Sequence, residues 1–268
     1  MLLENRHYKT LTNSLKFSLK HSITMSQLLL VLITGANQGI GYYTAQHLAS
    51  TGHYHVLLGA RSLLKAEKAM KQLVETTSIL PSLLEPVEID LSSDNSIMTA
   101  AEQVKDKYGH LDILINNAGI AGAQFKGTET LRQRYQEIFD TNVSGTAVVT
   151  ETFLPLLQAS NAPLPGRRIV FVSSELGSME IAARGLTNLE YTQYNCSKAA
   201  LNMLALNYLK RLKDENITVV VTTPGYCATN LNNNSGSRLP QDGAMEIVVA
   251  ATEGKNGTFI KSGNIVPW

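Results

Sequence analysis

A tyrosine and a lysine four positions apart are the clearest chemical signal in the chain. Tyr194 and Lys198 would leave the same face of a helix. A phenol has an unperturbed pKa near ~10, too high for efficient proton exchange at neutral pH, and an adjacent ammonium is expected to lower it. Ser174, at the end of an apolar run, is placed to hydrogen-bond a substrate oxygen as charge gathers on it. The pair predicts proton transfer to a carbonyl or from an alcohol, although the same spacing also recurs on ordinary amphipathic helices.

A glycine-rich turn points to a second kind of chemistry, the binding of phosphate. Residues 34–41 read Thr-Gly-Ala-Asn-Gln-Gly-Ile-Gly and lie between an apolar run and a helical pattern. Glycines permit backbone conformations and close approaches that a Cβ would block. The free N–H groups and the dipole of the helix start then favour a pyrophosphate. Many turns of this kind need glycine for packing only, but the position between strand and helix favours a dinucleotide site.

Two basic residues suggest which dinucleotide would bind. Arg61 and Lys65 follow the second apolar run, where the residue that reads the ribose is expected in such a fold. An acidic residue there would accept a hydrogen bond from a ribose 2′-hydroxyl. Cations suit a 2′-phosphate instead, so we expect NADP(H). The alternative interpretation is a solvated helix start, which often carries Arg or Lys.

These residues require a parallel sheet to position them. Seven short runs rich in Val, Ile and Leu lack polar alternation, as in strands buried on both faces. Helical patterns such as 63–76 and 93–108 separate them and predict an α/β fold of the doubly wound Rossmann type, with a mainly parallel seven-stranded sheet and helices on both faces. No Pro/Gly-rich linker divides residues 28–268, so we expect one domain. The predicted strands are Leu28–Ile33, His55–Leu58, Leu83–Ile89, Leu111–Ile115, Arg168–Val172, Ile217–Thr222 and Gly257–Ile260.

Composition and charge exclude several classes of protein. A hydrophobic fraction of 44% in 268 residues excludes a disordered chain, and a net charge of +1 without a long basic run argues against a nucleic-acid partner. Cys196 and Cys227 are the only cysteines and form no metal-ligand pattern, so we expect neither a bound metal nor a disulfide scaffold. The longest clean apolar run, Leu28–Ile33, is too short to span a bilayer. We therefore expect a cytoplasmic protein.

The first stretch of chain differs in composition from the rest. Residues 1–24 hold four basic residues and one acid and are rich in Ser and Thr, which is typical of a transit peptide. A disordered extension, or an upstream start before Met25, fits the same composition. We favour an extension or extraneous segment over 1–27, because no apolar face at helical spacing supports targeting.

Further motifs follow the predicted strands in a fixed order. Together with the glycine turn and Tyr194…Lys198, their order and spacing resembles the short-chain dehydrogenase/reductase family from about Leu28 to Trp268. Asn37 beside Arg61, and the closing Gly-Asn-Ile-Val-Pro-Trp, are similar to the carbonyl-reductase-like, NADP-preferring branch. The motifs are Asp90-Leu91, Asn116-Asn117-Ala118-Gly119, Ser173-Ser174 and Pro224-Gly225-Tyr226-Cys227-Ala228-Thr229.

The resemblance implies an NADP(H)-dependent oxidoreductase that acts on a ketone or aldehyde, or on the matching secondary alcohol. It implies that Tyr194 donates the proton, that Lys198 also holds the nicotinamide ribose and that Ser174 orients the carbonyl. Asn142, within Asp-Thr-Asn-Val, matches the helix asparagine that holds a water of the family's proton relay. These four residues form the predicted catalytic set.

The resemblance also assigns the cofactor contacts. Asp90 would face the adenine, Ile40 and Asn117 would contact the cofactor, and Thr229 would bond the nicotinamide carboxamide. The Pro224-Gly225 backbone would approach the nicotinamide, with Cys227 in the same turn. The complete predicted cofactor set is Gly35, Asn37, Gln38, Gly39, Ile40, Gly41, Arg61, Lys65, Asp90, Leu91, Asn117, Ala118, Gly119, Tyr194, Lys198, Pro224, Gly225, Cys227 and Thr229.

Several alternatives stay open at this stage. A catalytically inactive NADP(H)-binding sensor or regulatory protein would share the fold, whereas a methyltransferase would leave the Tyr-x-x-x-Lys pair unexplained. Tyr191 lacks a lysine partner and is interpreted as structural. Residues 175–193 are predicted to border the substrate, and a short, flexible covering segment is predicted after Thr229. The substrate, the physiological direction and the formation of a homo-oligomer are left open.

Overall fold

The computed structural model describes residues 28–163, 166–187 and 189–268. The segment 1–27, predicted to be an extension, lies outside the described residues. Within the described part of the chain, no helix is both long and apolar enough to cross a membrane.

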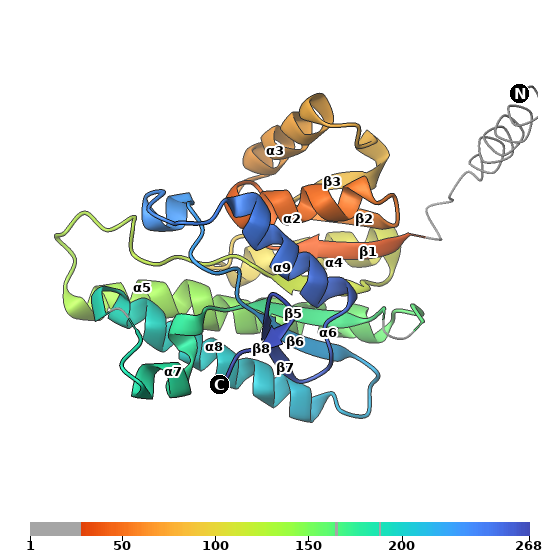
Figure 1. The fold of residues 1–268 in the computed structure, drawn as a ribbon. Coiled ribbons are helices and arrows are strands. Elements are labelled where there is room, and N and C mark those ends of the chain that lie inside the picture. The colour runs from red at the N-terminus through yellow and green to blue at the C-terminus, as the bar shows by residue number, and fades with distance from the viewer. Residues whose placement is uncertain (1–27, 164–165, 188) are drawn as a thin grey trace, which may run out of the picture.

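One twisted sheet forms the centre of the molecule (Figure 1). Its strands lie in the order β3-β2-β1-β4-β5-β6-β7-β8, and all neighbours are parallel except β7 and β8. The seven predicted strands are confirmed. The eighth pairs antiparallel with β7 and was missed because it is only two residues long. The strands are β1 Leu29–Ile33, β2 Tyr54–Ala60, β3 Leu84–Glu88, β4 Ile113–Asn116, β5 Arg168–Val172, β6 Thr218–Thr222, β7 Thr258–Lys261 and β8 Asn264–Ile265.

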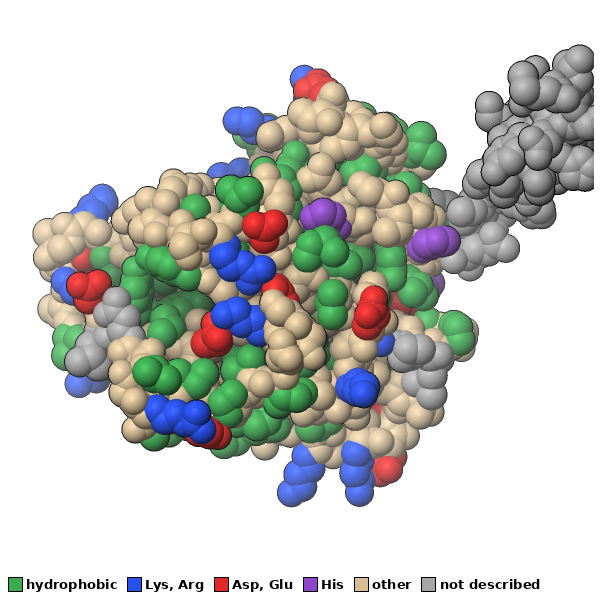
Figure 2. Space-filling model, viewed as in Figure 1, with side chains coloured by type: hydrophobic (Ala, Val, Ile, Leu, Met, Phe, Trp, Pro, Cys, Tyr) green, Lys and Arg blue, Asp and Glu red, His purple; other side chains and the backbone are tan. Residues whose placement is uncertain are grey.

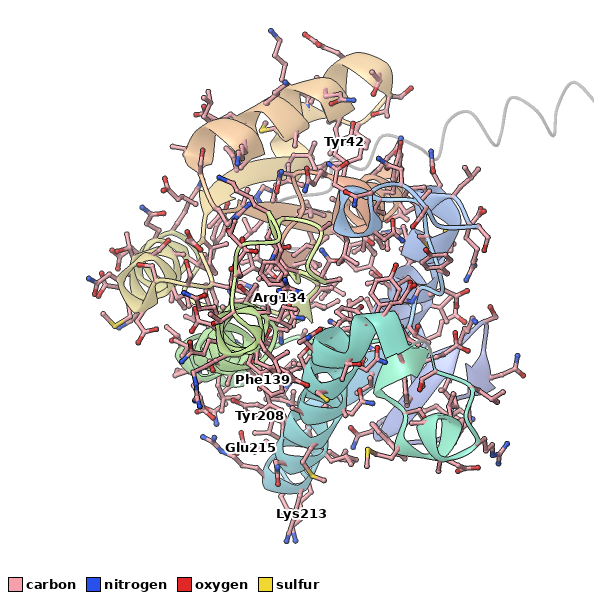
Figure 3. The ribbon with its side chains drawn as sticks, turned by 90° about the vertical axis from the view of Figure 1, so that its left-hand side faces the viewer. Tyr42, Arg134, Phe139, Tyr208, Lys213 and Glu215 are labelled. Atoms are coloured by element: carbon pink, nitrogen blue, oxygen red, sulfur yellow. The ribbon has the colours of Figure 1, made fainter. Side chains whose placement is uncertain are left out.

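Helices cover both faces of the sheet, as the sequence predicted. Successive residues of a strand point to opposite faces, so Val31 packs with α2, α3 and α9 whereas Leu32 packs with α4, α6 and α8. Figure 3 shows α8 beside α5, with Tyr208 and Phe139 on these two helices. The helices are α2 Gly39–Ser50, α3 Leu63–Thr76, α4 Asp94–Tyr108, α5 Leu131–Phe139, α6 Thr146–Gln158, α7 Met179–Ala183, α8 Thr192–Arg211 and α9 Pro240–Thr252, with short helical turns at Pro81–Leu83, Asp140–Gly145, Glu175–Gly177, Leu189–Tyr191 and Asn230–Asn232.

The strand order places the predicted motifs at one edge of the sheet. β1 lies between β2 and β4, so the chain winds away from β1 in both directions. In such a sheet, ligands bind outside the carboxyl ends of the strands at this switch point. The glycine turn follows β1, the Asn-Asn-Ala-Gly turn follows β4 and Ser174 follows β5, so the three motifs gather at the same crevice.

Candidate active site

The glycine turn after β1 is built for close backbone approach. Gly35 and Gly39 have φ values of +67° and +58°, which favour glycine. A Cβ on Gly41 would lie 2.4 Å from Asn117 Nδ2 and 2.6 Å from the Gly35 carbonyl oxygen. The turn leads directly into α2, which begins at Gly39. The N-terminus of α2 therefore borders the crevice, with no Cβ at Gly39 or Gly41.

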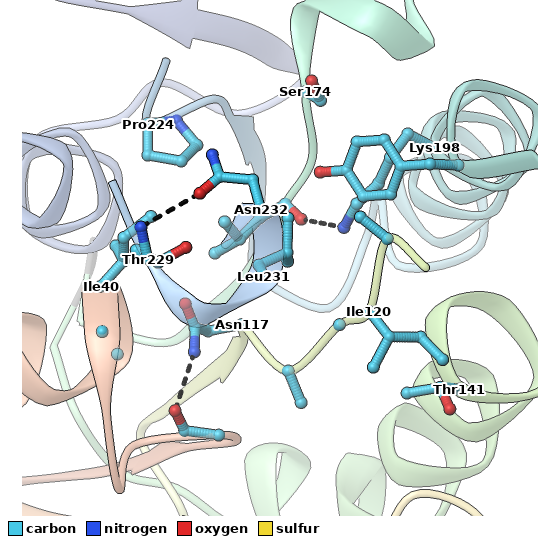
Figure 4. Close-up of a pocket in the computed structure, with 18 of the residues that line it drawn as sticks. Ile40, Asn117, Ile120, Thr141, Ser174, Lys198, Pro224, Thr229, Leu231 and Asn232 are labelled. Carbon is cyan, nitrogen blue, oxygen red and sulfur yellow. Dashed lines mark hydrogen bonds between the residues drawn. The ribbon is translucent and has the colours of Figure 1, made fainter. Parts of the chain in front are cut away.

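The turn after β4 is tied to the glycine turn through Thr34. The Thr34 hydroxyl accepts hydrogen bonds from the backbone N–H groups of Asn117 and Ala118, each at 3.0 Å. In return, Asn117 Nδ2 donates to the Thr34 carbonyl at 2.8 Å and to the Gly35 carbonyl at 3.3 Å, the second of which Figure 4 shows. The Asn117 side chain thus fixes the two turns relative to each other, and both border the same cavity.

Charged side chains line the cavity at the end of β2 and β3. Arg61 and Lys65 are exposed there, at the end of β2 and in the first turn of α3. Asp90 accepts hydrogen bonds from the Ser92 backbone N–H at 3.0 Å and from its hydroxyl at 2.8 Å. The cavity is thus lined by two exposed cations and by a carboxylate that Ser92 orients.

Tyr194 and Lys198 lie together on the first two turns of α8. Lys198 is only 4% exposed, and its ammonium donates to the Val172 carbonyl at 2.8 Å, while lying 5.6 Å from the Tyr194 ring centroid. Tyr194 lies near Ser174, whose Oγ accepts a hydrogen bond from the Leu176 backbone N–H at 3.2 Å. Ser174, Tyr194 and Lys198 all line the cavity, and Figure 4 shows the hydrogen bond from Lys198 to the Val172 carbonyl.

The pKa of Tyr194 differs from the prediction, which expected the neighbouring ammonium to lower it. Burial raises the pKa of Tyr194 to about 12, and the neighbouring Ser174 hydroxyl only partly opposes this. Burial lowers the pKa of Lys198 to about 8. The expected lowering of the Tyr194 pKa is therefore wrong for this structure, because loss of hydration around the phenolate outweighs any stabilisation by the ammonium. At neutral pH, Tyr194 is a protonated phenol beside a protonated amine.

Asn142 lies behind the cavity and not on its wall. It was predicted on a regular helix, but it stands in the π-helical turn Asp140–Gly145 between α5 and α6. Its Oδ1 accepts from the Ile120 backbone N–H at 2.8 Å, and its Nδ2 donates to the Ile120 carbonyl at 2.9 Å and to Ser197 Oγ at 3.0 Å. The Asn142 side chain thus joins the segment around Ile120, which follows β4, to α8.

An arginine that the sequence reading missed holds the turn after β6. Arg238 donates to the Pro224 carbonyl at 2.9 Å and forms a 3.0 Å ion pair with the buried carboxylate of Glu246 on α9. Its backbone also pairs with Tyr226 and Ala228. The segment after Thr229, predicted to be flexible, is therefore bonded at its far end to the turn that it follows. No motif in the sequence marked Arg238.

The cavity brings together all but one of the predicted residues. It has a volume of about 1030 Å³ and is lined by every predicted catalytic and cofactor residue except Asn142. The predicted border segment 175–193 also lines it, through Glu175, Leu176, Ile181, Leu186 and Tyr191. Tyr191, interpreted as structural from the sequence, is thus a wall residue. Its distance of three positions from Tyr194 was the available signal.

Comparison with known proteins establishes the family. Residues 29–240 match the family model described as short chain dehydrogenase. The chain belongs to the short-chain dehydrogenase family. This family member is 49% identical over 230 residues to the short-chain dehydrogenase anuI of Penicillium roqueforti, covering 84% of this chain and 89% of the relative. It is 36% identical over 223 residues to the short-chain dehydrogenase/reductase eupG of Phoma sp., covering 77% of this chain and 80% of the relative.

A solved structure supports the same placement of this short-chain dehydrogenase. The NADPH-bound carbonyl reductase from chicken fatty liver superimposes with a TM-score of 0.77 at 26% identity, over 90% of this chain and 100% of that chain. The predicted family, the Rossmann-type fold and the carbonyl-reductase-like relatives are confirmed.

Proposed function

We propose that this short-chain dehydrogenase is an NADP(H)-dependent oxidoreductase that reduces a ketone or aldehyde, or oxidises the matching secondary alcohol. The observation that carries the proposal is the meeting of Ser174, Tyr194 and Lys198 in the cavity that also contains the glycine turn. A nucleotide-binding protein without catalysis has no need of a proton donor at this position.

The residues of the crevice fit a dinucleotide. Positive φ at Gly35 and Gly39, and the absence of room for a Cβ at Gly41, leave backbone N–H groups open to a pyrophosphate. Arg61 and Lys65 would hold a ribose 2′-phosphate, and Asp90 would face the adenine. Thr229 and the Pro224-Gly225 turn would border the nicotinamide. When bound, the cofactor supplies the hydride acceptor or donor.

Residues of the chain itself then orient the substrate oxygen and donate the proton to it. Ser174 Oγ and the Tyr194 hydroxyl hydrogen-bond the substrate oxygen, and Tyr194 gives its proton to that oxygen during reduction. The raised pKa keeps the Tyr194 phenol protonated at neutral pH, which is the form that reduction needs. The Lys198 ammonium stabilises the negative charge that develops on the phenol oxygen. Asn142 acts as a positioning residue through the Ile120 segment.

Substitution of the proton donor tests the proposal. Tyr194→Phe should lower kcat for carbonyl reduction by roughly 10²–10⁴-fold, the usual contribution of general acid catalysis, while the Kd for NADPH stays unchanged. The measurement is NADPH oxidation against a panel of ketones and aldehydes, with NADPH fluorescence titration as the binding control. Unchanged turnover in the variant would contradict the role of Tyr194. NADPH binding without turnover by the wild-type protein on every carbonyl would favour the sensor alternative.

A further inference from the structure

The half of the cavity around Ser174 and Tyr194 has an apolar wall. Gly119 borders Lys198, since a Cβ on Gly119 would lie 3.6 Å from Lys198 Nζ, and the next residue, Ile120, also lines the cavity. Leu176 is adjacent through its hydrogen bond to Ser174. Figure 2 shows hydrophobic side chains gathered around a hollow on this side of the molecule. We define the substrate wall as Ile120, Leu176, Ile181, Leu186, Tyr191 and Tyr226.

Two tyrosines close the outer part of the substrate wall. The Tyr191 side chain lies close enough to Tyr226 for that residue to raise the Tyr191 pKa, and the Tyr226 hydroxyl lies 2.6 Å from Ser235 Oγ. Since Ser235 already engages the Tyr226 hydroxyl, the aromatic ring of Tyr226 is left to contact a ligand by apolar and edge interactions. Tyr226 is 49% and Leu186 68% exposed, which is a large apolar surface to leave in water at a cavity mouth.

The basic groups near this half of the cavity are already engaged. Lys261 forms a 2.6 Å ion pair with Glu175, and Arg238 pairs with Glu246. Neither of these two basic side chains lines the cavity, whereas the carboxylates of Glu137 and Asp140 do. Among the described residues, the lining cations besides Lys198 are Arg61 and Lys65.

The distribution of charge opposes an anionic substrate. Arg61 and Lys65 stand at the end of β2 and the start of α3, on the nucleotide side, and Lys198 is buried and bonded to the Val172 carbonyl. A substrate carboxylate or phosphate in the apolar half would lose hydration without gaining an ionic partner, which is strongly unfavourable. An uncharged ring would instead cover the exposed apolar surface.

We propose that Tyr191 and Tyr226 determine specificity and that the substrate wall selects uncharged, ring-bearing ketones or aldehydes over carbonyl compounds that carry a carboxylate or phosphate. The inference rests on the proposed function, because the substrate wall surrounds the proposed proton donor. It names the class of substrate that this reaction uses.

A matched pair of ligands tests the selection. 4-Acetylbenzamide and 4-acetylbenzoate have nearly the same shape and differ in charge. Calorimetry on the NADPH-loaded Tyr194→Phe variant measures their Kd values without turnover, and kcat/KM is measured on the wild-type protein. We expect the amide to bind at least tenfold more tightly and to be reduced with a correspondingly higher kcat/KM.

Variants assign the selection to the two tyrosines. Tyr191→Ala and Tyr226→Ala should each raise the Kd of the amide several-fold with an unchanged Kd for NADPH, whereas Tyr226→Phe keeps the ring and should keep the affinity. Tyr226→Arg adds a cation and should shift the preference toward the benzoate. Tyr135→Ala, on α5 and outside the cavity lining, is the control and should change neither ligand's Kd.

The outcomes separate the two proposals. Equal or tighter binding of the benzoate, absence of binding by both compounds, or unchanged binding in both alanine variants would overturn the selection by the substrate wall. Selective binding of the amide, with no reduction of either compound by the wild-type protein, would support the substrate wall and overturn the proposed reaction.

Discussion

The charged Lys198 side chain has lost nearly all of its contact with water. The residue is 4% exposed, and its ammonium donates to the Val172 carbonyl. Burial lowers the Lys198 pKa to about 8, and the group is thus still protonated at neutral pH. A buried charge that destabilises the fold is typical of residues retained for function at the expense of stability.

This burial predicts a pH-dependent stability difference between the wild-type protein and Lys198→Met. In the unfolded chain a lysine keeps its proton up to a pKa near ~10.4, so below pH 8 both states are charged and the folded state is destabilised in full. As the pH rises from 8 toward 10, the folded state loses the proton first and the destabilisation fades. Urea unfolding of both proteins should therefore show the wild-type protein gaining stability relative to the variant over this range. A pH-independent difference would contradict the lowered pKa.

At the residue scale, the motifs could be predicted because their chemistry is local. Tyr194, Lys198 and the glycine turn depend on spacings within one helix or one turn. Asn142, Tyr191 and Arg238 act through contacts with distant segments, such as the Asn142 bonds to Ile120 and the Arg238 bond to Pro224. A sequence pattern within one element does not contain these contacts.

At the scale of elements, a buried arginine fastens the end of α9 to the sheet. Arg168, in β5, is 2% exposed, and its guanidinium donates to the carbonyls of Ala250, Thr252 and Gly254 at 3.3, 3.1 and 2.6 Å. These carbonyls lie in the last turn of α9 or just after it, where acceptors lack partners within the helix. The planar fork of Arg suits several acceptors at once.

Loss of this guanidinium should destabilise the fold. Arg168→Met keeps most of the volume but leaves the buried carbonyls without their donors, and we expect the free energy of unfolding to fall by about 3 kcal/mol. Arg184→Met, which removes an exposed ion pair with Glu180 on α7, is the control and should change it by less than about 1 kcal/mol. Denaturant titration of both variants measures the difference. Equal effects would show that the Arg168 hydrogen bonds contribute no more than a surface pair.

The elements themselves were predictable where pattern and length agree. Strands such as β1, β4 and β5 are nearly continuous apolar runs, and α3 matches its predicted bounds of 63–76. The π-helical turn Asp140–Gly145 was not predicted, because one extra residue per turn leaves no signature in hydrophobic spacing. The two-residue β8 depends on its pairing with β7 and not on its own sequence.

At the scale of the whole molecule, the crevice joins segments from both halves of the sheet. The glycine turn and Arg61 belong to the β1–β3 half, whereas Ser174, Tyr194 and Thr229 come from the second half. Asn230 Nδ2 donates to Gln38 Oε1 at 3.1 Å, so the two halves already touch across the crevice. A dinucleotide bound along it would contact both halves and stabilise the folded chain as a unit.

Cofactor-dependent stabilisation should discriminate between the two nicotinamide dinucleotides. At about 100 times its Kd, NADPH should raise Tm by roughly 5–10 °C, and NADH at the same concentration should raise it less. Arg61→Asp should remove most of this difference, because the carboxylate repels a 2′-phosphate. Lys68→Asp, an exposed change on α3 outside the cavity, should preserve it. Equal shifts by NADPH and NADH in the wild-type protein would contradict the assignment of Arg61 to the 2′-phosphate.

The central claim is that hydride passes from NADPH to the carbonyl carbon while Tyr194 donates the proton. Deuterium labelling of the transferred hydrogen tests this claim most directly. NADPH deuterated at C4 of the nicotinamide, on the transferred side, is incubated with the wild-type protein and a neutral aryl ketone, and the alcohol is analysed by mass spectrometry and NMR. The account predicts one deuterium on the carbinol carbon for each cofactor consumed, at a rate that falls steeply in Tyr194→Phe although the cofactor remains bound. An alcohol without deuterium, or label transfer at the same rate in both proteins, would contradict it.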